Sequence, residues 1–292
     1  MTQLQKHVLI RWGTLTAGIS CLMTAVVVVL ISPGCQQVPM SERKRLPLIT
    51  SPQAENEIGL TAYKEVLEKE PVTKNERAAE MVRRVGRRIA DVANQPDFQW
   101  EFNVIESETQ NAFCLPGGKV AVYTGILPVC ENEAGLAVVM SHEIAHAIAR
   151  HGGERMNQQM ITNGLKNGGT FLLNKNKVSE QKQQILLAAY GQAAQYGYIL
   201  PYSRKHELEA DAIGIKLMAQ AGYDPSEAPV FWERFASKKE GSAPAEWMST
   251  HPADATRAAA LRELLPSAVR EYESSATKIG LGESLLLTAK QE

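Results

Sequence analysis

The sequence lacks the strong basic charge of a general nucleic-acid binder. Its 31 lysines and arginines are balanced by 32 aspartates and glutamates, which leaves a formal net charge of −1 at pH 7. A protein that binds nucleic acid through the phosphate backbone carries a clear basic excess. We therefore exclude nucleic acid as a partner. The C-terminal end also lacks a 34-residue helical repeat, which argues against a repeat architecture there.

Aspartate and cysteine are scarce as well. Acidity is carried by glutamate, and with only five aspartates each one inside a motif is informative. Of the four cysteines, Cys21 and Cys35 lie near the N-terminus, whereas Cys114 and Cys130 fall in the part predicted to fold. These two can pair in an oxidising compartment or remain buried free thiols. The sequence leaves both possibilities open.

What the sequence does contain is enough apolar residues for a core. A chain of 292 residues that is 44% hydrophobic has room for one large or two small domains. We place the folded domain at residues 54–272. A tether with few large apolar groups precedes it at residues 36–53, and a loose tail is predicted at residues 273–292.

The first 35 residues differ in composition from the rest. An uncharged run from Trp12 to Ser32, rich in Val, Leu and Ile, follows two basic residues and is long enough to span a bilayer. It indicates an export signal or a membrane anchor. The Gly-Cys ending at Cys35 resembles the lipobox of bacterial lipoproteins, although Ser32 and Pro33 depart from that pattern. We expect a lipoprotein signal over an uncleaved signal-anchor, and a periplasm-facing, outer-membrane location over an inner-membrane one.

Hydrophobic periodicity predicts helices first and then a small sheet. Apolar residues recur at three- and four-residue spacing over residues 54–69 and 75–94, which predicts two amphipathic helices. From Trp100 the period shifts towards two, and a hairpin follows in which 112–115 turns through a Pro-Gly-Gly into 119–124. An edge strand beside an active site can pair with a substrate backbone. An ordinary structural hairpin has the same pattern, and the sequence does not separate the two.

The stretch from Gly135 to Gly152 is apolar nearly all round, which predicts a buried helix. It contains His142 and His146, which project from the same face of a helix with 3.6 residues per turn and can bind one metal ion. Glu143 is rotated away from that metal but can reach a water bound to it. This is the H-E-x-x-H arrangement of zinc peptidases. The plain alternative, a pair of core histidines, is unfavourable because burying unpaired imidazoles and a carboxylate is costly.

A second polar face follows downstream. Ser203 is the predicted N-cap of a helix in which Glu207, Asp211 and Gly214 fall at i, i+4 and i+7, hence on one face. Two carboxylates and a glycine on one face favour close packing against the helix of His142. Further predictions for this half of the chain are a loop suited to a lid over 163–178, a helix over 181–196, a helix over 225–237, a loop over 241–250 and a helix from His251 to about Glu271.

Four blocks occur in a fixed order: NAFCLPGGKVAVYTGIL at 111–127, GLAVVMSHEIAHAIARHG at 135–152, ELEADAIG at 207–214 and THPADATR at 250–257. Together they resemble the M48 family of zinc peptidases, and within it the small bacterial lipoprotein members. The resemblance implies an α+β fold, that is, a mainly helical gluzincin-type metallopeptidase domain with a small sheet and an H-E-x-x-H active-site helix.

The resemblance also implies how the metal is held. Catalytic zinc usually has three protein ligands, and Glu207 is expected to join His142 and His146 around one Zn²⁺ per chain. Asp211 is expected to orient a ligating histidine by accepting its second ring N–H. On this interpretation the neighbouring His206 and Glu209 lie off the ligand face.

The implied reaction is metal-assisted hydrolysis of peptide bonds, with Glu143 taking the water proton and passing it to the leaving amine. The substrate is expected to lie extended along the hairpin, beside Asn111, Val120 and Val122. We count His251 with Glu143 as catalytic, because His251 can donate a hydrogen bond to the developing oxyanion. Two alternatives stay open for His251: it can fill the open coordination position of zinc and inhibit, or it can cap the following helix from the surface.

The main expectation is therefore a membrane-associated zinc endopeptidase that acts on protein or peptide substrates, with misfolded envelope proteins as the expected set. One alternative is a chaperone-like binder of misfolded envelope proteins in which proteolysis is secondary. Another is a membrane-tethered scaffold whose zinc is structural. Glu143 argues against the scaffold, because a structural zinc needs no base beside it.

Overall fold

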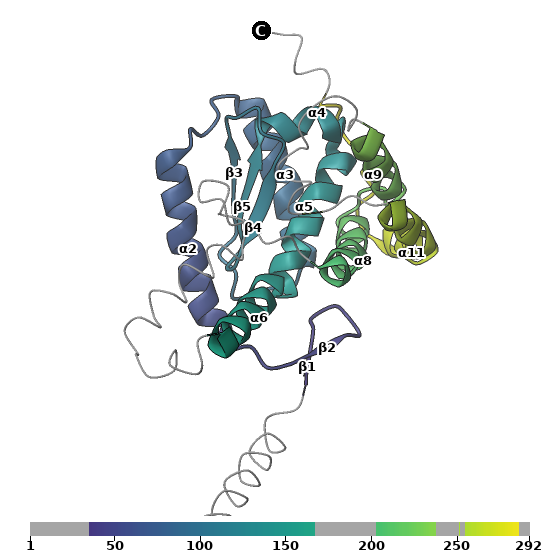
Figure 1. Cartoon of the computed structure of the whole chain (residues 1–292). Coiled ribbons are helices and arrows are strands. Elements are labelled where there is room, and N and C mark those ends of the chain that lie inside the picture. The colour runs from purple at the N-terminus through teal and green to yellow at the C-terminus, as the bar shows by residue number, and fades with distance from the viewer. Residues whose placement is uncertain (1–34, 167–202, 238–250, 252–254, 286–292) are drawn as a thin grey trace, which may run out of the picture. The chain divides into compact units, whose positions relative to one another are not determined.

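The computed structural model describes residues 35–166, 203–237, 251 and 255–285, which are coloured in Figure 1. Three predicted features lie wholly or mostly outside this part of the chain: the loop over 163–178, the helix over 181–196 and the loop over 241–250. The apolar run over 12–32 also lies outside it. Within the described part, no helix is both long and apolar enough to cross a membrane.

The chain divides into two compact units, one of residues 1–38 and 42–47 and one of residues 39–41 and 48–292. In the first unit the described residues form an antiparallel pair of short strands, β1 (Gln36–Gln37) and β2 (Lys44–Arg45). Backbone pairing therefore closes part of the segment 36–53 into a short hairpin.

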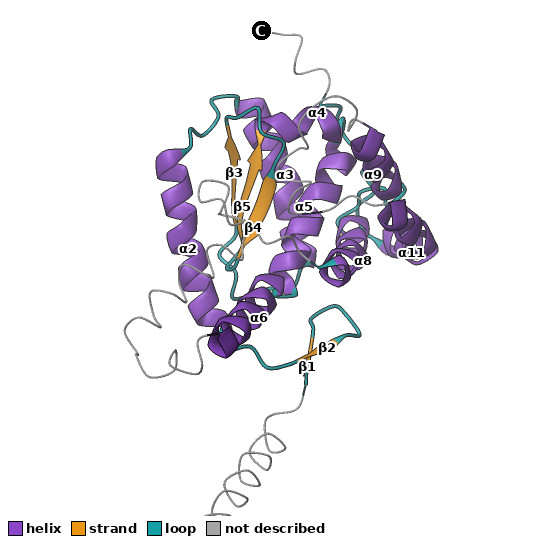
Figure 2. Cartoon of the chain, viewed as in Figure 1, coloured by secondary structure: helices purple, strands orange, loops and turns teal. Residues whose placement is uncertain are grey.

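The second unit contains a three-stranded sheet, which Figure 2 shows between helix α2 and the helices α3 and α5. This arrangement confirms the predicted mainly helical α+β class. In chain order the elements are α2 (Pro52–Lys69), α3 (Glu76–Val92), β3 (Glu101–Ile105), β4 (Ala112–Leu115), β5 (Lys119–Tyr123), η1 (Thr124–Ile126), α4 (Leu127–Cys130), α5 (Glu133–Ile148), α6 (His151–Lys166), α8 (Arg204–Gln220), α9 (Glu227–Ser237) and α11 (Ala255–Ser274).

Side-chain caps explain where the helices begin. The side chain at the N-cap accepts a hydrogen bond from a first-turn N–H in α2, α3, α5 and α8, the capping residues being Ser51, Asn75, Asn132 and Ser203. Such a bond satisfies one of the four N–H groups that have no partner within the helix. The predicted cap at Ser203 is confirmed.

The strand order in the sheet is β3-β5-β4, with β3 parallel and β4 antiparallel to β5. Gly117 and Gly118 make the β4–β5 turn with φ of +83° and +79°, which a residue with a Cβ rarely adopts. The central strand is thus β5, and both of its edges are used in pairing. The assignment of Val120 and Val122 to substrate binding is wrong for this reason, and both side chains are 0% exposed.

Helix α5 is buried along its whole length, as its apolar sequence predicts. It ends at Ile148, however, and not near Gly152. Arg150 has a φ of +55°, which is uncommon for a residue other than glycine, and α6 begins at the next residue. The Arg150 guanidinium donates to both carboxylate oxygens of Glu55, at 2.9 and 2.7 Å, and to the Thr50 carbonyl at 2.7 Å. These long-range bonds hold the break in place.

The segment after α11 is not loose where the structure describes it. The backbone N–H groups of Glu133 and Ala134, in the first turn of α5, donate to the carbonyls of Glu283 and Leu281. Leu285 is 5% exposed and donates its N–H to the Glu131 carbonyl. The prediction of a loose tail is therefore wrong for residues 275–285, which complete the start of the α5 helix.

Candidate metal centre

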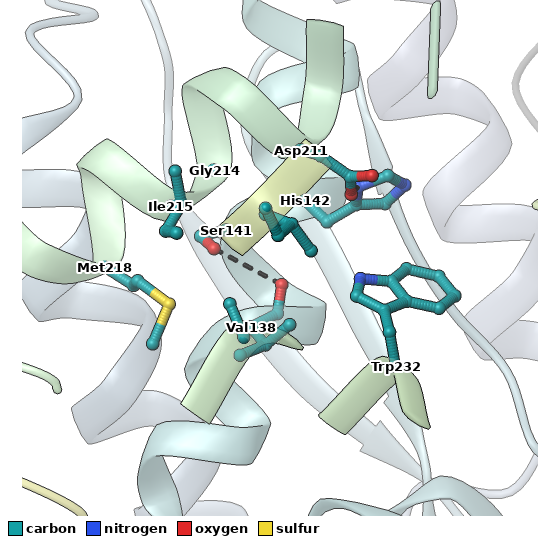
Figure 3. A pocket seen from close by; sticks show the side chains of 10 residues that line it. Val138, Ser141, His142, Asp211, Gly214, Ile215, Met218 and Trp232 are labelled. Carbon is teal, nitrogen blue, oxygen red and sulfur yellow. Dashed lines mark hydrogen bonds and ion pairs between the residues drawn. The ribbon is translucent and has the colours of Figure 1, made fainter. Parts of the chain in front are cut away.

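Helices α5 and α8 pack side by side, and a glycine sets their separation. A Cβ added at Gly214 of α8 would lie 3.1 Å from the backbone nitrogen of His142 and 3.2 Å from the Ser141 carbonyl carbon. A side chain at this position would force the two backbones apart by a few tenths of an ångström, so Gly214 favours their close approach. Figure 3 shows Gly214 and Asp211 beside Ser141 and His142. The predicted close packing of this face is confirmed.

Four side chains converge between these helices, and we call them the metal cluster: His142, His146, Glu207 and His251. One nitrogen or oxygen from each lies within 4.8 Å of the others, and all four side chains are buried. The Nε2 atoms of His142 and His146 are 3.0 Å apart. Each of these atoms also lies 3.4 Å from a carboxylate oxygen of Glu207.

The spacing of these atoms suits a zinc ion. A tetrahedral site with bonds of about 2.1 Å has ligand-to-ligand edges of about 3.4 Å. The observed separations of 3.0 and 3.4 Å are close to that value. Imidazole nitrogen and carboxylate oxygen are also ligands that zinc prefers. The residues present therefore fit this metal.

Asp211 fixes the orientation of His142. Its Oδ1 atom lies 3.0 Å from Nδ1 of the histidine, so that ring nitrogen donates a hydrogen bond to the carboxylate and Nε2 is the atom that faces the metal cluster. This is the position that the predicted orienting role requires. Arg257 holds the carboxylate in turn, since its Nε and Nη2 lie 2.7 and 2.6 Å from the two oxygens of Asp211.

Arg257 is the residue that sequence reasoning missed. It is 2% exposed, and its Nη1 forms an ion pair of 2.8 Å with Glu207. The guanidinium carbon lies 3.6 Å from the centre of the Trp232 ring, a cation–π contact. One buried cation thus serves both carboxylates of the site. The only signal in the sequence is its place in the THPADATR block.

The protonation of the site follows from these contacts. Burial would lower the pKa of His142, but hydrogen bonds to Asp211 and Glu207 outweigh burial and raise it to about 9. Burial lowers the pKa of His146 well below its usual value. For Glu207, burial acts against ionisation, but the neighbouring His251 and the bonds to His142 and His146 hold its pKa well below the usual range. These shifts favour a carboxylate anion at Glu207 and a neutral imidazole at His146.

Glu143 lies beside the metal cluster without being part of it. The side chain is buried, and its Oε1 is 3.4 Å from Nε2 of His251. Glu143 also lies close enough to Cys114 of β4 to act on its thiol: burial and the charge of Glu143 together raise the pKa of that thiol. Glu143 is therefore adjacent to the metal cluster, where its carboxylate can act on a molecule bound there.

His251 is buried at 3% exposure, which contradicts the surface-cap alternative. Its Nδ1 lies 3.1 and 3.3 Å from the two Glu207 oxygens and 3.2 Å from Nε2 of His142. A ring nitrogen pointing at the ligand atoms has the position of a fourth ligand. The geometry favours this role over the expected oxyanion donor.

The other predicted site residues lie outside the metal cluster. Asn111 is 8% exposed at the start of β4, where its carbonyl accepts from the N–H of Tyr123 and its side-chain oxygen from the N–H of Ala112. Cys114 and Cys130 are both buried free thiols, so the disulfide alternative does not hold.

A second group, which we call the support cluster, lies next to His146 and consists of the buried residues His151, His206 and Glu209 and the partly buried Glu154. His151 bonds to Glu209 at 2.9 Å, and His206 pairs with Glu154 at 3.3 Å. The prediction that His206 and Glu209 lie off the ligand face is confirmed. His151 was not predicted to have a role, although it falls inside the same block as His142.

A small cavity is lined in part by His142 and Asp211 (Figure 3). Its volume is about 10 Å³, at the lower limit for a single water molecule. It is lined by Val138, Ser141, His142, Asp211, Gly214, Ile215, Met218, Ala228, Trp232 and Leu261. A space of this size does not admit a peptide, so it is not a substrate pocket.

Comparison with known proteins points to one family. The profile of peptidase family M48 matches residues 76–265. The mitochondrial metalloendopeptidase OMA1 of Schizosaccharomyces pombe is 39% identical over 82% of this chain and 69% of its own length. Human metalloendopeptidase OMA1, also mitochondrial, is 34% identical over 63% of this chain and 36% of its own length. The beta-barrel assembly-enhancing protease of Escherichia coli is 29% identical over 70% of this chain and 43% of its own length.

The expected location is overturned by these comparisons. The fission yeast and human relatives are both named as mitochondrial proteins, which contradicts a bacterial outer-membrane lipoprotein. That expectation depended on an apolar run and a Gly-Cys pair in the first 35 residues. Such short features report hydrophobicity and one reactive side chain, and neither identifies a compartment.

Proposed function

The chain belongs to peptidase family M48 and is a zinc metallopeptidase, and we propose that it cleaves internal peptide bonds of unfolded or misfolded protein chains. One observation carries this proposal: two histidines and a glutamate, the ligand set of a catalytic zinc, converge within 4.8 Å, and the buried carboxylate of Glu143 lies beside them. His142, His146 and Glu207 would hold the ion. The aligned region spans about half or less of several relatives, so the substrates of those proteins are not transferred to this chain.

Zinc bound at this site supplies a Lewis acid that polarises the scissile carbonyl and lowers the pKa of a bound water towards ~7. The residues of the chain do the rest. Glu143 accepts the proton of the attacking water and delivers it to the leaving nitrogen. Asp211 and Arg257 keep the ring of His142 and the carboxylate of Glu207 in fixed orientations, so no reorganisation is needed when charge develops.

We place an extended substrate along β4 instead of β5. Of the two strands that pair with β5, β4 is the one packed against α5. An edge strand can add one more strand through backbone hydrogen bonds, without regard to side-chain identity. This mode suits unfolded chains, which expose their backbone, and excludes most folded ones. Asn111 at the start of β4 remains part of this proposal.

Membrane association and the domain limits are further parts of the proposal. The apolar run over 12–32 supports attachment of the chain to a membrane, with residues 36–53 as the connection to a peptidase domain at 54–272 and residues 273–292 following it. The envelope compartment is not included, since the comparisons contradict that location.

Digestion of casein, an unfolded protein, tests the function. The purified chain should cleave it, lose activity with a chelator and regain activity on addition of zinc. Glu143→Gln should fold and bind zinc like the wild type but lose about 10²–10⁴-fold in rate, because the amide cannot accept the proton. Full activity of this variant would rule out Glu143 as the base. If the wild type suppresses casein aggregation without cleaving it, the chaperone-like alternative is the correct one.

A further inference from the structure

The two metal-facing histidines of α5 are supported in different ways. His142 meets a carboxylate directly, since its Nδ1 lies 3.0 Å from Asp211. His146 has an imidazole in the same place, because its Nδ1 lies 2.9 Å from Nδ1 of His151. The series of hydrogen bonds that starts at His146 therefore continues through a second imidazole ring, that of His151. What lies at its far end decides the state of both rings.

The far end is Glu209 of α8. Nε2 of His151 lies 2.9 Å from Oε2 of this carboxylate, and the Ser41 hydroxyl donates to the other oxygen. His151 is 0% exposed and Glu209 is 9% exposed. An ionised carboxylate only accepts hydrogen bonds, so beside it Nε2 of His151 carries a proton and donates a hydrogen bond to Glu209.

The remaining protons follow from this one bond. If Nε2 of a neutral His151 is protonated, its Nδ1 is an acceptor. The facing Nδ1 of His146 must then carry the proton that the two nitrogens share. Nε2 of His146 is left with a free lone pair, and this is the atom that lies 3.0 Å from Nε2 of His142 and 3.4 Å from Glu207. One carboxylate thus determines the tautomer of a ring that it does not touch.

We propose that Glu209 and His151 are positioning residues that hold His146 in the tautomer and orientation required for binding zinc. The proposal rests on the proposed function only in that the metal cluster holds zinc. It assigns to the support cluster the task that Asp211 performs for His142, carried out through one additional ring. His151 and Glu209 touch neither substrate nor metal and act through His146.

The fold holds this relay rigidly. The left-handed conformation of Arg150 ends α5 and makes His151 the first residue of α6, which turns the ring back towards His146. The ring of His206 stacks on that of His151, with centroids 4.4 Å apart and planes inclined at 24°. Glu154 holds His206 in turn. The ring of His151 is therefore held by its place at the start of α6 and by its contact with His206 of α8.

Zinc affinity, measured by competition with a chromophoric chelator, tests the relay independently of activity. His151→Phe keeps a ring but removes the acceptor for the His146 N–H, and we expect a 10–100-fold weaker zinc affinity. Glu209→Gln keeps a neutral acceptor and should lose less, about threefold to tenfold. Glu227→Gln is the matched control, because it changes a buried carboxylate that pairs with Arg234 outside both clusters, and it should stay within twofold of the wild type.

Nitrogen NMR of the full, zinc-loaded chain labelled at histidine provides a readout that needs no variant. We expect a proton on Nδ1 of His146 with scalar coupling across the bond to Nδ1 of His151, and loss of that signal in His151→Phe. Zinc affinity of His151→Phe within twofold of the wild type would overturn the relay. So would a wild-type spectrum in which His146 binds zinc through Nδ1, and this holds even if the variant fails to fold.

These measurements separate the relay from the proposed function. A chain that binds zinc tightly, shows the relay signal and leaves casein intact would refute the endopeptidase and leave the relay standing. A chain that cleaves casein but shows no dependence of zinc affinity on His151 would do the reverse.

Discussion

The metal cluster and the support cluster are built from the same residue types on neighbouring helical turns, yet only one of them is a metal site. In the metal cluster, two histidine nitrogens face each other at 3.0 Å and share the two oxygens of Glu207. In the support cluster each histidine has its own carboxylate, and the two rings stack on each other. Ligand atoms that converge on one point leave room for a cation. Ligand atoms that are satisfied in pairs do not.

The comparison shows that composition alone does not define a metal site. Glu207 and Glu209 are two residues apart on α8, so they project about 200° apart on the helix. One carboxylate faces α5 and the metal cluster, and the other faces the start of α6. The direction in which the helix presents each carboxylate decides whether it can be a ligand or a support.

Replacing each of these two glutamates by alanine, one at a time, tests the difference between the two clusters most directly. Glu207→Ala should lose its bound zinc, and with it the peptidase activity, because two imidazoles alone hold zinc poorly. Glu209→Ala should still hold one zinc per chain when the metal is in excess, since it removes only a support of His146. Metal analysis of the two purified variants, each dialysed against the same zinc-containing buffer, checks this. Equal zinc content in both variants would show that the ligand face has been assigned wrongly.

Arg257 provides the next test, because it supplies a buried positive charge to two carboxylates of the site, Glu207 and Asp211. Its charge and hydrogen bonds hold the pKa of Asp211 below the usual value although burial acts in the opposite direction. Arg257→Met keeps much of the volume but leaves two buried carboxylates without their cation. We expect the metal-free chain to lose about 3–5 kcal/mol of unfolding free energy.

Denaturant unfolding at pH 7 measures that loss. Arg262→Met is the matched control, because Arg262 is half exposed in its ion pair with Glu233 and such pairs contribute about 0–1 kcal/mol. The direction of the pH dependence follows from the lowered pKa of Asp211. The contribution of the ionised carboxylate to the unfolding free energy is present above its unfolded-state pKa and is lost as pH falls through its folded-state pKa. The two variants should therefore approach each other in stability in acid. A constant difference at all pH values would contradict the charge-based account.

Much of the site could be predicted because its signals are local. The spacing of His142 and His146 and the spacing of Glu207, Asp211 and Gly214 each lie within about two helical turns, where period and face follow from helix geometry alone. The N-cap at Ser203 is local in the same sense. These are the parts of the fold and site for which the sequence-based expectation and the structure agree.

The parts that could not be predicted depend on contacts between distant residues. The central position of β5 follows from its parallel pairing with β3, which no hairpin pattern encodes. Arg150, between α5 and α6, is bound by Glu55, which lies 95 residues earlier in the chain. Arg257 lies 46 residues from Asp211, and an arginine in a sequence gives no sign that it will be buried.

His251 is the member of the metal cluster whose role is tested last. Its ring nitrogen can either donate a hydrogen bond to the oxyanion or act as a fourth ligand of the metal. An oxyanion donor is worth roughly 10²–10³ in rate, so His251→Ala would be nearly inactive with zinc retained. A fourth ligand would instead occupy the position that the attacking water needs. In the wild type only the fraction of molecules in which His251 leaves that position free would be active. Removal of the ring would make all molecules active and raise the cleavage rate by about the inverse of that fraction, a several-fold effect. Because Nδ1 of His251 lies 3.1 Å from Glu207 and 3.2 Å from His142, we expect the gain. Casein cleavage by His251→Ala and wild type at equal zinc content decides between the roles, and a loss of a hundredfold or more would restore the donor.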